Sequence, residues 1–303
     1  MPGYVCNLAL LVYMKNITLS CLLTVLVLSF STLVACTSVE SFDYQIHGTT
    51  MGTTYNVTLV FSHKVDAPKV DLIKDAIQSA LNDVDNAMST YKDSSELSSI
   101  NNLPVDTPYT LSNEIHEVLV YAKNLYITTD GLFDITVGPL IDLWGFGVKN
   151  PVFKAPVQNA LDKVSLSIGS NFFNIDDGVI TKQSLVKIDL SAIAKGYAVD
   201  QVAKVLDALF IKNYLIEVGG EISAKGISPR HDLWVLGIEI PDTMVRKAFT
   251  RIHLDGVSMA TSGDYRNYFE FNGRRYSHTL NPKTSYPVTH KLASVSVVAK
   301  TCM

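Results

Sequence analysis

The chain contains 303 residues, of which 47% are hydrophobic and 18% are charged, and its formal net charge is −4. This much apolar and aromatic material supports a large hydrophobic core and excludes a chain that is disordered throughout. A nucleic-acid surface would need a clustered basic excess, which the sequence lacks, so we expect no nucleic-acid partner.

A targeting segment is predicted at the N-terminus. Lys15 precedes an apolar run over residues 22–34, and small residues lead up to Cys36. A basic region, a short apolar region and small residues before a cleavage point are typical of a secretory signal, and a small residue before Cys resembles a bacterial lipobox. We therefore predict a lipoprotein-type signal peptide over residues 1–35, a lipidated Cys36 and a tether over residues 36–44. A membrane-spanning helix is the alternative.

The cysteines agree with this prediction. Two of the four lie within or before the signal, and Cys36 would carry lipid, so Cys302 is left without a partner for an internal disulfide. One remaining cysteine also excludes a cysteine-based zinc site. The start of translation is either Met1 or Met14, because Met14 would begin a signal of conventional length.

The remaining chain alternates between strand-like and helix-like patterns. Tyr55–Phe61 predicts a strand, and apolar residues three and four apart predict an amphipathic helix over Val70–Met88 and a second one capped by Ser112. A short helix is expected within the mixed connection over residues 151–180. These elements predict an α+β fold, with helices packed on mainly antiparallel sheets, in one domain over residues 45–303. The later elements are a helix over Ala198–Leu209 and strands over Tyr214–Val218, Leu233–Ile240, Phe249–Leu254 and Ala293–Ala299.

Polar, glycine-rich segments interrupt these elements, and three of them precede residue 150. In His47–Thr53, small residues would let backbone N–H groups approach a ligand, or would only form a turn. Tyr91 would stack on an aromatic ring, or would be a half-buried residue after a helix end. Asp134 lies among apolar neighbours, so its carboxylate needs donors from a ligand or from its own loop.

Two further segments of this kind lie in the C-terminal half. In Lys187–Asp200 a strand is expected to lead into a helix through a small-residue turn, and helix N-termini favour anions. Lys195 would add positive charge toward a pyrophosphate; the alternative is a capping Asp or Ser beside a solvated lysine. His278 lies between strand-like runs, with Arg266 and a Gly/Ser turn nearby, and is either catalytic or structural.

Seven short motifs follow one another along the chain: Thr50-Met51-Gly52-Thr53, Met88-Ser89-Thr90-Tyr91, Phe133 to Pro139, Asp189-Leu190-Ser191 with Lys195 to Asp200, Val218 to Glu221, Thr261 to Tyr265, and Tyr276-Ser277-His278. As an ordered set they resemble the ApbE family, the FAD:protein FMN transferases. The resemblance runs from about Ser41 to the end of the chain, and it implies an ApbE-like fold.

The resemblance also implies the roles of individual residues. Ala192 would offer its backbone carbonyl, a hard oxygen ligand, to Mg²⁺. His278 matches the general base of the family. The residues implied to contact FAD are Met51, Tyr91, Leu132, Phe133, Asp134, Asp189, Lys195 and Leu280.

The activity implied by the resemblance is a transfer of FMN from FAD to a protein. A Thr or Ser hydroxyl of the acceptor would attack the FMN-side phosphorus of FAD, and AMP would leave. The acceptor proteins would carry a Ser/Thr flavinylation motif, as in subunits of sodium-pumping quinone reductases and related complexes. Together with the predicted signal, this places the protein on the periplasmic side of the inner membrane, held by a lipid anchor.

The sequence departs from the family pattern near its end. Asn281 and Ser285 occupy positions where relatives often have Asp and Gly. In the family, an Ala-Asp-Ala-x-Ala-Thr segment with further magnesium ligands follows the position of Met303, so we expect the chain to be truncated. Two alternatives to the transferase remain open: an FAD pyrophosphatase that gives FMN and AMP, and a non-catalytic periplasmic flavin-binding lipoprotein.

Overall fold

The computed structural model describes residues 41–147, 154–241, 247–263 and 268–303. The predicted signal peptide, the Cys36 predicted to carry lipid, and Arg266 lie outside the described residues. Within the described part of the chain, no helix is both long and apolar enough to cross a membrane.

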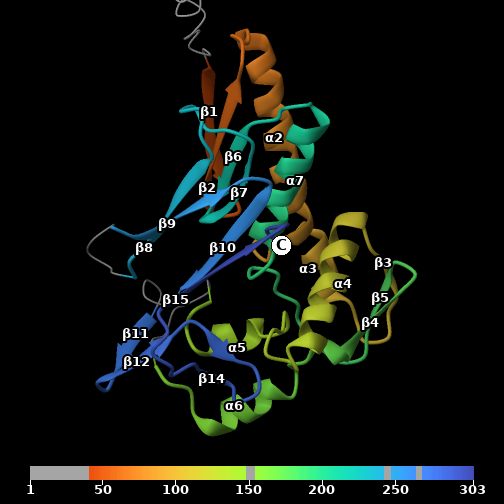
Figure 1. Ribbon diagram of the computed structural model, residues 1–303. Coiled ribbons are helices and arrows are strands. Elements are labelled where there is room, and N and C mark those ends of the chain that lie inside the picture. Colours follow the sequence, from red (N-terminus) through yellow and green to blue (C-terminus); the bar gives the residue numbers. More distant parts are fainter. Residues whose placement is uncertain (1–40, 148–153, 242–246, 264–267) are drawn as a thin grey trace, which may run out of the picture. The chain divides into compact units, whose positions relative to one another are not determined.

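A six-stranded sheet forms the centre of the fold (Figure 1). Its strands lie in the order β1-β2-β6-β7-β10-β15, and every neighbouring pair is antiparallel. This arrangement confirms the predicted antiparallel character of the α+β fold. The strands are β1 (Phe42–Thr50), β2 (Thr53–Phe61), β6 (Tyr214–Val218), β7 (Glu221–Lys225), β10 (Val257–Gly263) and β15 (Ser294–Ala299).

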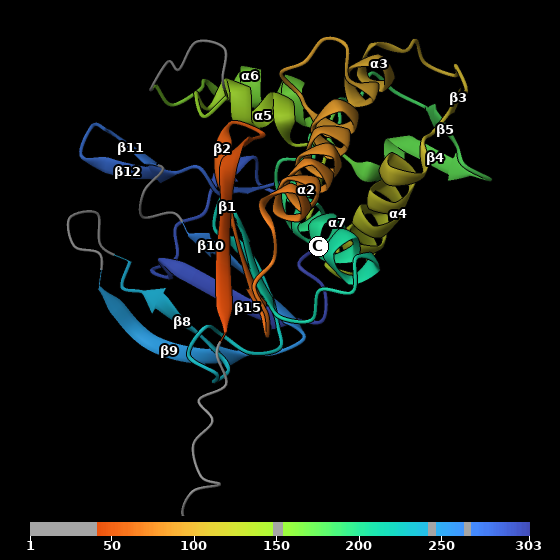
Figure 2. The ribbon, with the colours of Figure 1, turned by 90° about the horizontal axis from the view of Figure 1, so that it is seen from above.

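Two helices, α2 (Ala67–Met88) and α7 (Ala194–Ala208), cover one face of this sheet, and they lie side by side in both ribbon views (Figure 2). Alternate β2 residues, Tyr55, Val57 and Leu59, are buried in the main hydrophobic cluster with both helices. Side chains two apart on a strand share a face, so this alternation directs β2 toward the helices.

The opposite face of the sheet is covered by a hairpin of β8 (Trp234–Glu239) and β9 (Ala248–Leu254). Its buried residues Trp234 and Leu254 pack with Val60 of β2 in a second cluster. Burial on both faces explains why the central strands are rich in apolar residues.

Smaller elements surround the helical face. The helix α4 (Asn113–Thr128) belongs to the main cluster through its apolar side. A third cluster forms around Trp144, Leu161 and Phe269. The remaining elements are α3 (Glu96–Asn102), the small sheet of β3 (Tyr109–Thr110), β4 (Phe173–Asp176) and β5 (Val179–Lys182), the helices α5 (Gly138–Leu143), α6 (Gln158–Ser165) and η1 (Ser170–Phe172), and the hairpins β11 (Tyr268–Phe271) with β12 (Arg274–Ser277) and β13 (Leu280–Asn281) with β14 (Tyr286–Pro287).

Several predicted elements are confirmed within a few residues of their predicted bounds. The predicted helix over Val70–Met88 lies within α2, and the predicted strand over Tyr214–Val218 has the bounds of β6. Ser112 caps α4, because its hydroxyl oxygen accepts a hydrogen bond from the Ile115 N–H group. The short helix expected between residues 151 and 180 is α6.

Three expectations about element bounds differ from the structure. The strand β1 begins at Phe42, inside the segment predicted as a tether, and pairs with β2 along its whole length. The helix α7 begins at Ala194 rather than at Ala198, because the Ala194 N–H group already donates to the Leu190 carbonyl oxygen at 2.8 Å. The strand expected at the beginning of Lys187–Asp200 is wrong: residues 187–189 form no regular secondary structure and join no sheet.

Candidate functional site

Two adjoining cavities lie beside the C-terminal end of α2 and the N-terminal end of α7. The larger, about 830 Å³, is lined by α3, by residues 187–191, by the start of α5 and by His278. The smaller, about 590 Å³, is lined by the turn between β1 and β2, by the end of α2 and by the start of α7. Both are lined by Thr90, Tyr91 and Ser191, so these three residues join the two spaces.

The two cavities bring together half of the residues that the sequence predicts for the site. The predicted residues that line them are Met51, Tyr91, Asp189, Lys195 and His278. The predicted residues outside both linings are Leu132, Phe133, Asp134, Ala192 and Leu280.

Asp189 lies in a tightly held turn that lines the larger cavity. Its N–H group donates to the Ile135 carbonyl oxygen at 2.7 Å, and its Oδ1 accepts from the Ser191 N–H group at 2.8 Å. Gly138 approaches so closely that an added Cβ would lie 3.3 Å from the Asp189 Cβ. The small residue at the start of α5 therefore allows this turn to pack against the neighbouring loop.

Lys195 lies in the first turn of α7 and forms an ion pair that the sequence did not predict. Its Nζ lies 2.9 Å from Glu221 Oε2 and donates to the Gly219 carbonyl oxygen at 3.2 Å. Burial raises the pKa of the Glu221 carboxyl, and the neighbouring Lys195 ammonium group opposes this shift. The ammonium group is thus held beside the smaller cavity, at the N-terminal end of a helix that itself favours anions.

The hairpin between β6 and β7 explains how Glu221 reaches Lys195. Its two turn residues, Gly219 and Gly220, have φ values of 54° and 99°. Two residues with positive φ make the tight hairpin turn that matches the twist of the flanking strands, and glycine adopts them without strain. A side chain at Gly219 would also collide with Thr53 and crowd Lys195.

Met51 and Tyr91, two of the residues expected to contact FAD, border the smaller cavity. Met51 and Gly52 form the turn between β1 and β2, with φ values of 47° and 71°. Tyr91 is 66% exposed and follows the end of α2. An exposed ring in a cavity wall is available for stacking, which distinguishes it from the half-buried helix-end residue that was the alternative.

Asp134 has its hydrogen-bond donors inside its own loop region. Its Oδ1 accepts from the Thr136 N–H group at 2.9 Å, from the Thr136 hydroxyl at 2.7 Å and from the Ser170 hydroxyl at 2.8 Å. The carboxylate is buried, and these donors supply the partners that a buried carboxylate requires. The loop therefore supplies three donors to one oxygen of Asp134, whereas the neighbouring Leu132 is exposed.

His278 lines the larger cavity, and its ring lies 6.3 Å from that of Phe146 in an edge-to-face arrangement. The turn that follows it contains both departures from the family pattern. Asn281 Oδ1 accepts from the Lys283 N–H group at 2.9 Å, so the asparagine stabilises this turn. Ser285 has a φ of 60°, where glycine would avoid the steric cost, and its carbonyl oxygen accepts from Trp144 Nε1 at 2.9 Å.

Ala192 fits a magnesium ion through a single oxygen. The residue is exposed just before α7, and no backbone N–H group of the described residues donates to its carbonyl oxygen. The same residues contain no group of three His, Cys, Asp or Glu side chains that could hold a metal. Mg²⁺ is commonly bound through one or two protein oxygens together with substrate phosphates and waters, so one carbonyl is a partial fit.

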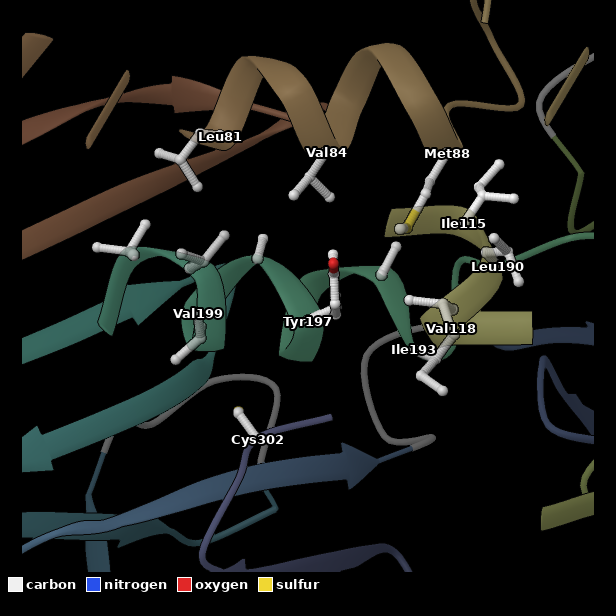
Figure 3. Packing of buried hydrophobic residues seen from close by; sticks show 14 of the residues in the cluster. Leu81, Val84, Met88, Ile115, Val118, Leu190, Ile193, Tyr197, Val199 and Cys302 are labelled. Carbon is white, nitrogen blue, oxygen red and sulfur yellow. The ribbon is translucent and has the colours of Figure 1, made fainter. Parts of the chain in front are cut away.

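The residues after β15 pack directly on the start of α7, on the side away from α2 (Figure 3). The Cys302 and Met303 N–H groups donate to the Asp200 carboxylate at 2.8 and 2.9 Å. A side chain at Gly196 would overlap the Cys302 carbonyl group. Burial raises the pKa of the Asp200 carboxyl, and the two N–H groups oppose this shift. In the sequence, Gly196 and Asp200 stand out only as members of a motif. Their contacts with residues 302 and 303 were not predicted, because no local pattern reveals them.

Two joined cavities thus have a lysine at a helix start in one lining and a histidine in the other. The chain belongs to the ApbE family, which residues 51–303 match. It is 41% identical over 279 residues to the FAD:protein FMN transferase of Haemophilus influenzae, covering 89% of this chain and 80% of that protein. The FAD:protein FMN transferase of Vibrio cholerae is 38% identical over 262 residues, covering 86% and 78%.

Solved structures of the same family have the same fold. The flavinyl transferase ApbE of Pseudomonas stutzeri, in its apo form, superimposes with a TM-score of 0.79 at 34% identity, covering 88% of this chain and 83% of that one. The flavin transferase ApbE of Vibrio cholerae gives a TM-score of 0.78 at 34% identity, covering 86% and 83%. The α+β, ApbE-like fold expected from the sequence is confirmed.

Proposed function

We propose that this chain is an FAD:protein FMN transferase. A Ser or Thr hydroxyl oxygen of an acceptor protein attacks the FMN-side phosphorus of FAD, forming a phosphoester bond. The P–O bond of the diphosphate breaks, and AMP leaves with the bridging oxygen. The proton of the attacking hydroxyl passes to His278.

The observation that carries this proposal is the joining of the two cavities at Tyr91 and Ser191. It places Lys195 and the start of α7 in one space and His278 in the adjoining one. A dinucleotide is long enough to need both spaces, with its diphosphate near the joining residues. The acceptor hydroxyl then approaches from the side that holds the base.

The residues of the chain contribute to this reaction by charge and position. Lys195 and the N-terminal end of α7 stabilise the negative charge of the diphosphate. Tyr91 stacks on a ring of FAD, and the turn at Asp189 orients the phosphates. His278 acts as the general base, a role that typically contributes roughly two to four powers of ten in rate.

Magnesium is part of the proposal. Ala192 would hold Mg²⁺ through its carbonyl oxygen, and the ion, when bound, neutralises charge on the diphosphate. We further propose that the protein is exported and anchored by lipid at Cys36 on the periplasmic side of the inner membrane, as the apolar run and Ala35-Cys36 suggest. Its acceptors would be Ser/Thr-motif subunits of sodium-pumping quinone reductase-like complexes.

AMP release tests the proposed reaction. The chain is incubated with FAD and Mg²⁺, with and without an acceptor protein that carries the flavinylation motif. AMP that appears only with the acceptor supports transfer. AMP that appears equally without it indicates an FAD pyrophosphatase, and FAD binding without AMP indicates a flavin-binding lipoprotein; either result would refute the proposal.

A further inference from the structure

The side chain of Asn101 is bound to the backbone of a residue far away in the sequence. Its Oδ1 accepts from the Ile188 N–H group at 2.7 Å, and its Nδ2 donates to the Ile188 carbonyl oxygen at 2.8 Å. The amide thus pairs with Ile188 as a neighbouring strand would. These two bonds replace the sheet partner that residues 187–189 lack.

The backbone of Asn101 is also bound by a buried lysine. Lys182 Nζ donates to the Asn101 carbonyl oxygen at 2.9 Å, and only 1% of Lys182 is exposed. The Lys182 carbonyl oxygen in turn accepts from the Asp106 N–H group at 2.8 Å. The end of α3 therefore has little freedom to move away from the segment that it binds.

The bound segment forms a wall of the candidate site. Asn101, Ile188 and Asp189 all line the larger cavity. Asp189 follows Ile188 directly and is held on its other side by the Ile135 carbonyl oxygen at 2.7 Å. The position of Asp189 is thus determined by Asn101 on one side and by the loop at Ile135 on the other.

We propose that Asn101 is a positioning residue that fixes the Ile188–Ser191 segment in the conformation that binds FAD. This inference rests on the proposed function, and Asn101 acts through Asp189 and Ser191 rather than by chemistry of its own. Loss of one of the two amide bonds would leave a backbone group of Ile188 unpaired beside the cavity and release the turn.

The variant Asn101→Asp tests the inference with little change in size. The carboxylate still accepts from the Ile188 N–H group, but it places an oxygen against the Ile188 carbonyl oxygen in place of the donor. We expect the dissociation constant of FAD, measured by fluorescence titration, to rise about tenfold. We also expect KM for FAD to rise more than kcat falls, and the Ile188 amide to exchange its hydrogen faster.

Asn213→Asp is the matched control. Asn213 also bridges backbone groups through its amide, accepting from the Ile227 N–H group at 3.0 Å and donating to the Val60 carbonyl oxygen at 3.4 Å, and it lines neither cavity. We expect this variant to lose stability while it binds FAD as the unmodified chain does. If Asn101→Asp does not fold, Asn101→Gln keeps a neutral amide with altered reach and is expected to weaken binding less.

The outcomes separate this inference from the proposed function. An unmodified chain that binds no FAD refutes both. An unmodified chain that binds FAD, with a folded Asn101 variant that binds it equally well, refutes only the positioning role. Equal weakening by Asn101→Asp and Asn213→Asp would also refute it, because the effect would then be one of general stability.

Discussion

The Lys195 ammonium group lies 2.9 Å from the Glu221 carboxylate, and this pair joins the first turn of α7 to the first residue of β7. The pair borders the smaller cavity through Lys195. Glu221 holds the lysine in place before any ligand binds. A diphosphate in the cavity would then share the ammonium group with a carboxylate that burial already destabilises in its charged form.

Replacing Lys195 by Met should weaken FAD binding by at least about tenfold, because one charge-assisted contact to the diphosphate is lost. It should also lower the free energy of unfolding by about 1–2 kcal/mol, since Glu221 would be left without its partner in a partly buried position. Fluorescence titration and urea unfolding measure the two effects. Lys225→Met is the control, because Lys225 pairs with Asp207 at 2.8 Å and lines neither cavity; an equal loss of FAD affinity there would contradict the assignment.

The raised pKa of Glu221 predicts a pH dependence of stability. The folded state keeps this proton to higher pH than the unfolded state, so Glu221 contributes its full stability below its ordinary pKa of about 4.3. That contribution is lost as the pH rises through the raised pKa of the folded state. We therefore expect the unfolding free energy of the unmodified chain, relative to Glu221→Gln, to fall as the pH rises above the ordinary pKa of the carboxyl. If the difference in unfolding free energy stays flat or rises with pH, burial does not dominate the pKa of the Glu221 carboxyl.

Replacing Gly196 by Ala should destabilise the protein. In an ordinary helix this change is stabilising by roughly 1 kcal/mol. Here the added methyl group would overlap the Cys302 carbonyl group, so we expect a net loss of about 1–3 kcal/mol. Urea unfolding measures the change. Ala203→Gly on the same helix is the control and should also lose stability; a stabilised Gly196→Ala would show that residues 302–303 do not pack on α7.

Replacing Tyr91 by Ala should weaken FAD binding by about tenfold, because a stacked ring contributes roughly 1–3 kcal/mol. The side chain is 66% exposed, so the melting temperature should hardly change. Tyr91→Phe keeps the ring and should bind FAD as the unmodified chain does. Equal affinities of the Ala and Phe variants would leave no role for stacking.

Periodicity predicted the long elements well, because burial on one face imposes a regular apolar pattern. The helix α2 and the strand β6 are examples, each with its inward residues at regular spacing. The strand expected to lead into the helix within Lys187–Asp200 does not form. The Ile188 backbone instead bonds to the Asn101 side chain, a partner 87 residues away that no local pattern reveals.

Residues of the candidate site were predictable where they lie in short motifs that follow one another along the chain. Tyr91, Lys195 and His278 stood out by type and by motif, and the structure places them around joined cavities. The partner of Lys195 did not stand out, because the hairpin at Gly219 brings Glu221 to it across 26 residues. The donors to the Asp134 carboxylate could not be predicted, because only the folded loop brings Thr136 and Ser170 to it.

The measurement that tests the central claim most directly is covalent flavin on an acceptor protein. The chain, FAD, Mg²⁺ and an acceptor with the Ser/Thr motif are incubated, and the acceptor is examined by in-gel flavin fluorescence after denaturation, with His278→Asn in parallel. We predict a fluorescent acceptor band with the unmodified chain and a band at least about 100-fold weaker with His278→Asn. A non-fluorescent acceptor under conditions where the chain binds FAD would contradict the assignment as a transferase, and equal bands would contradict the role of His278.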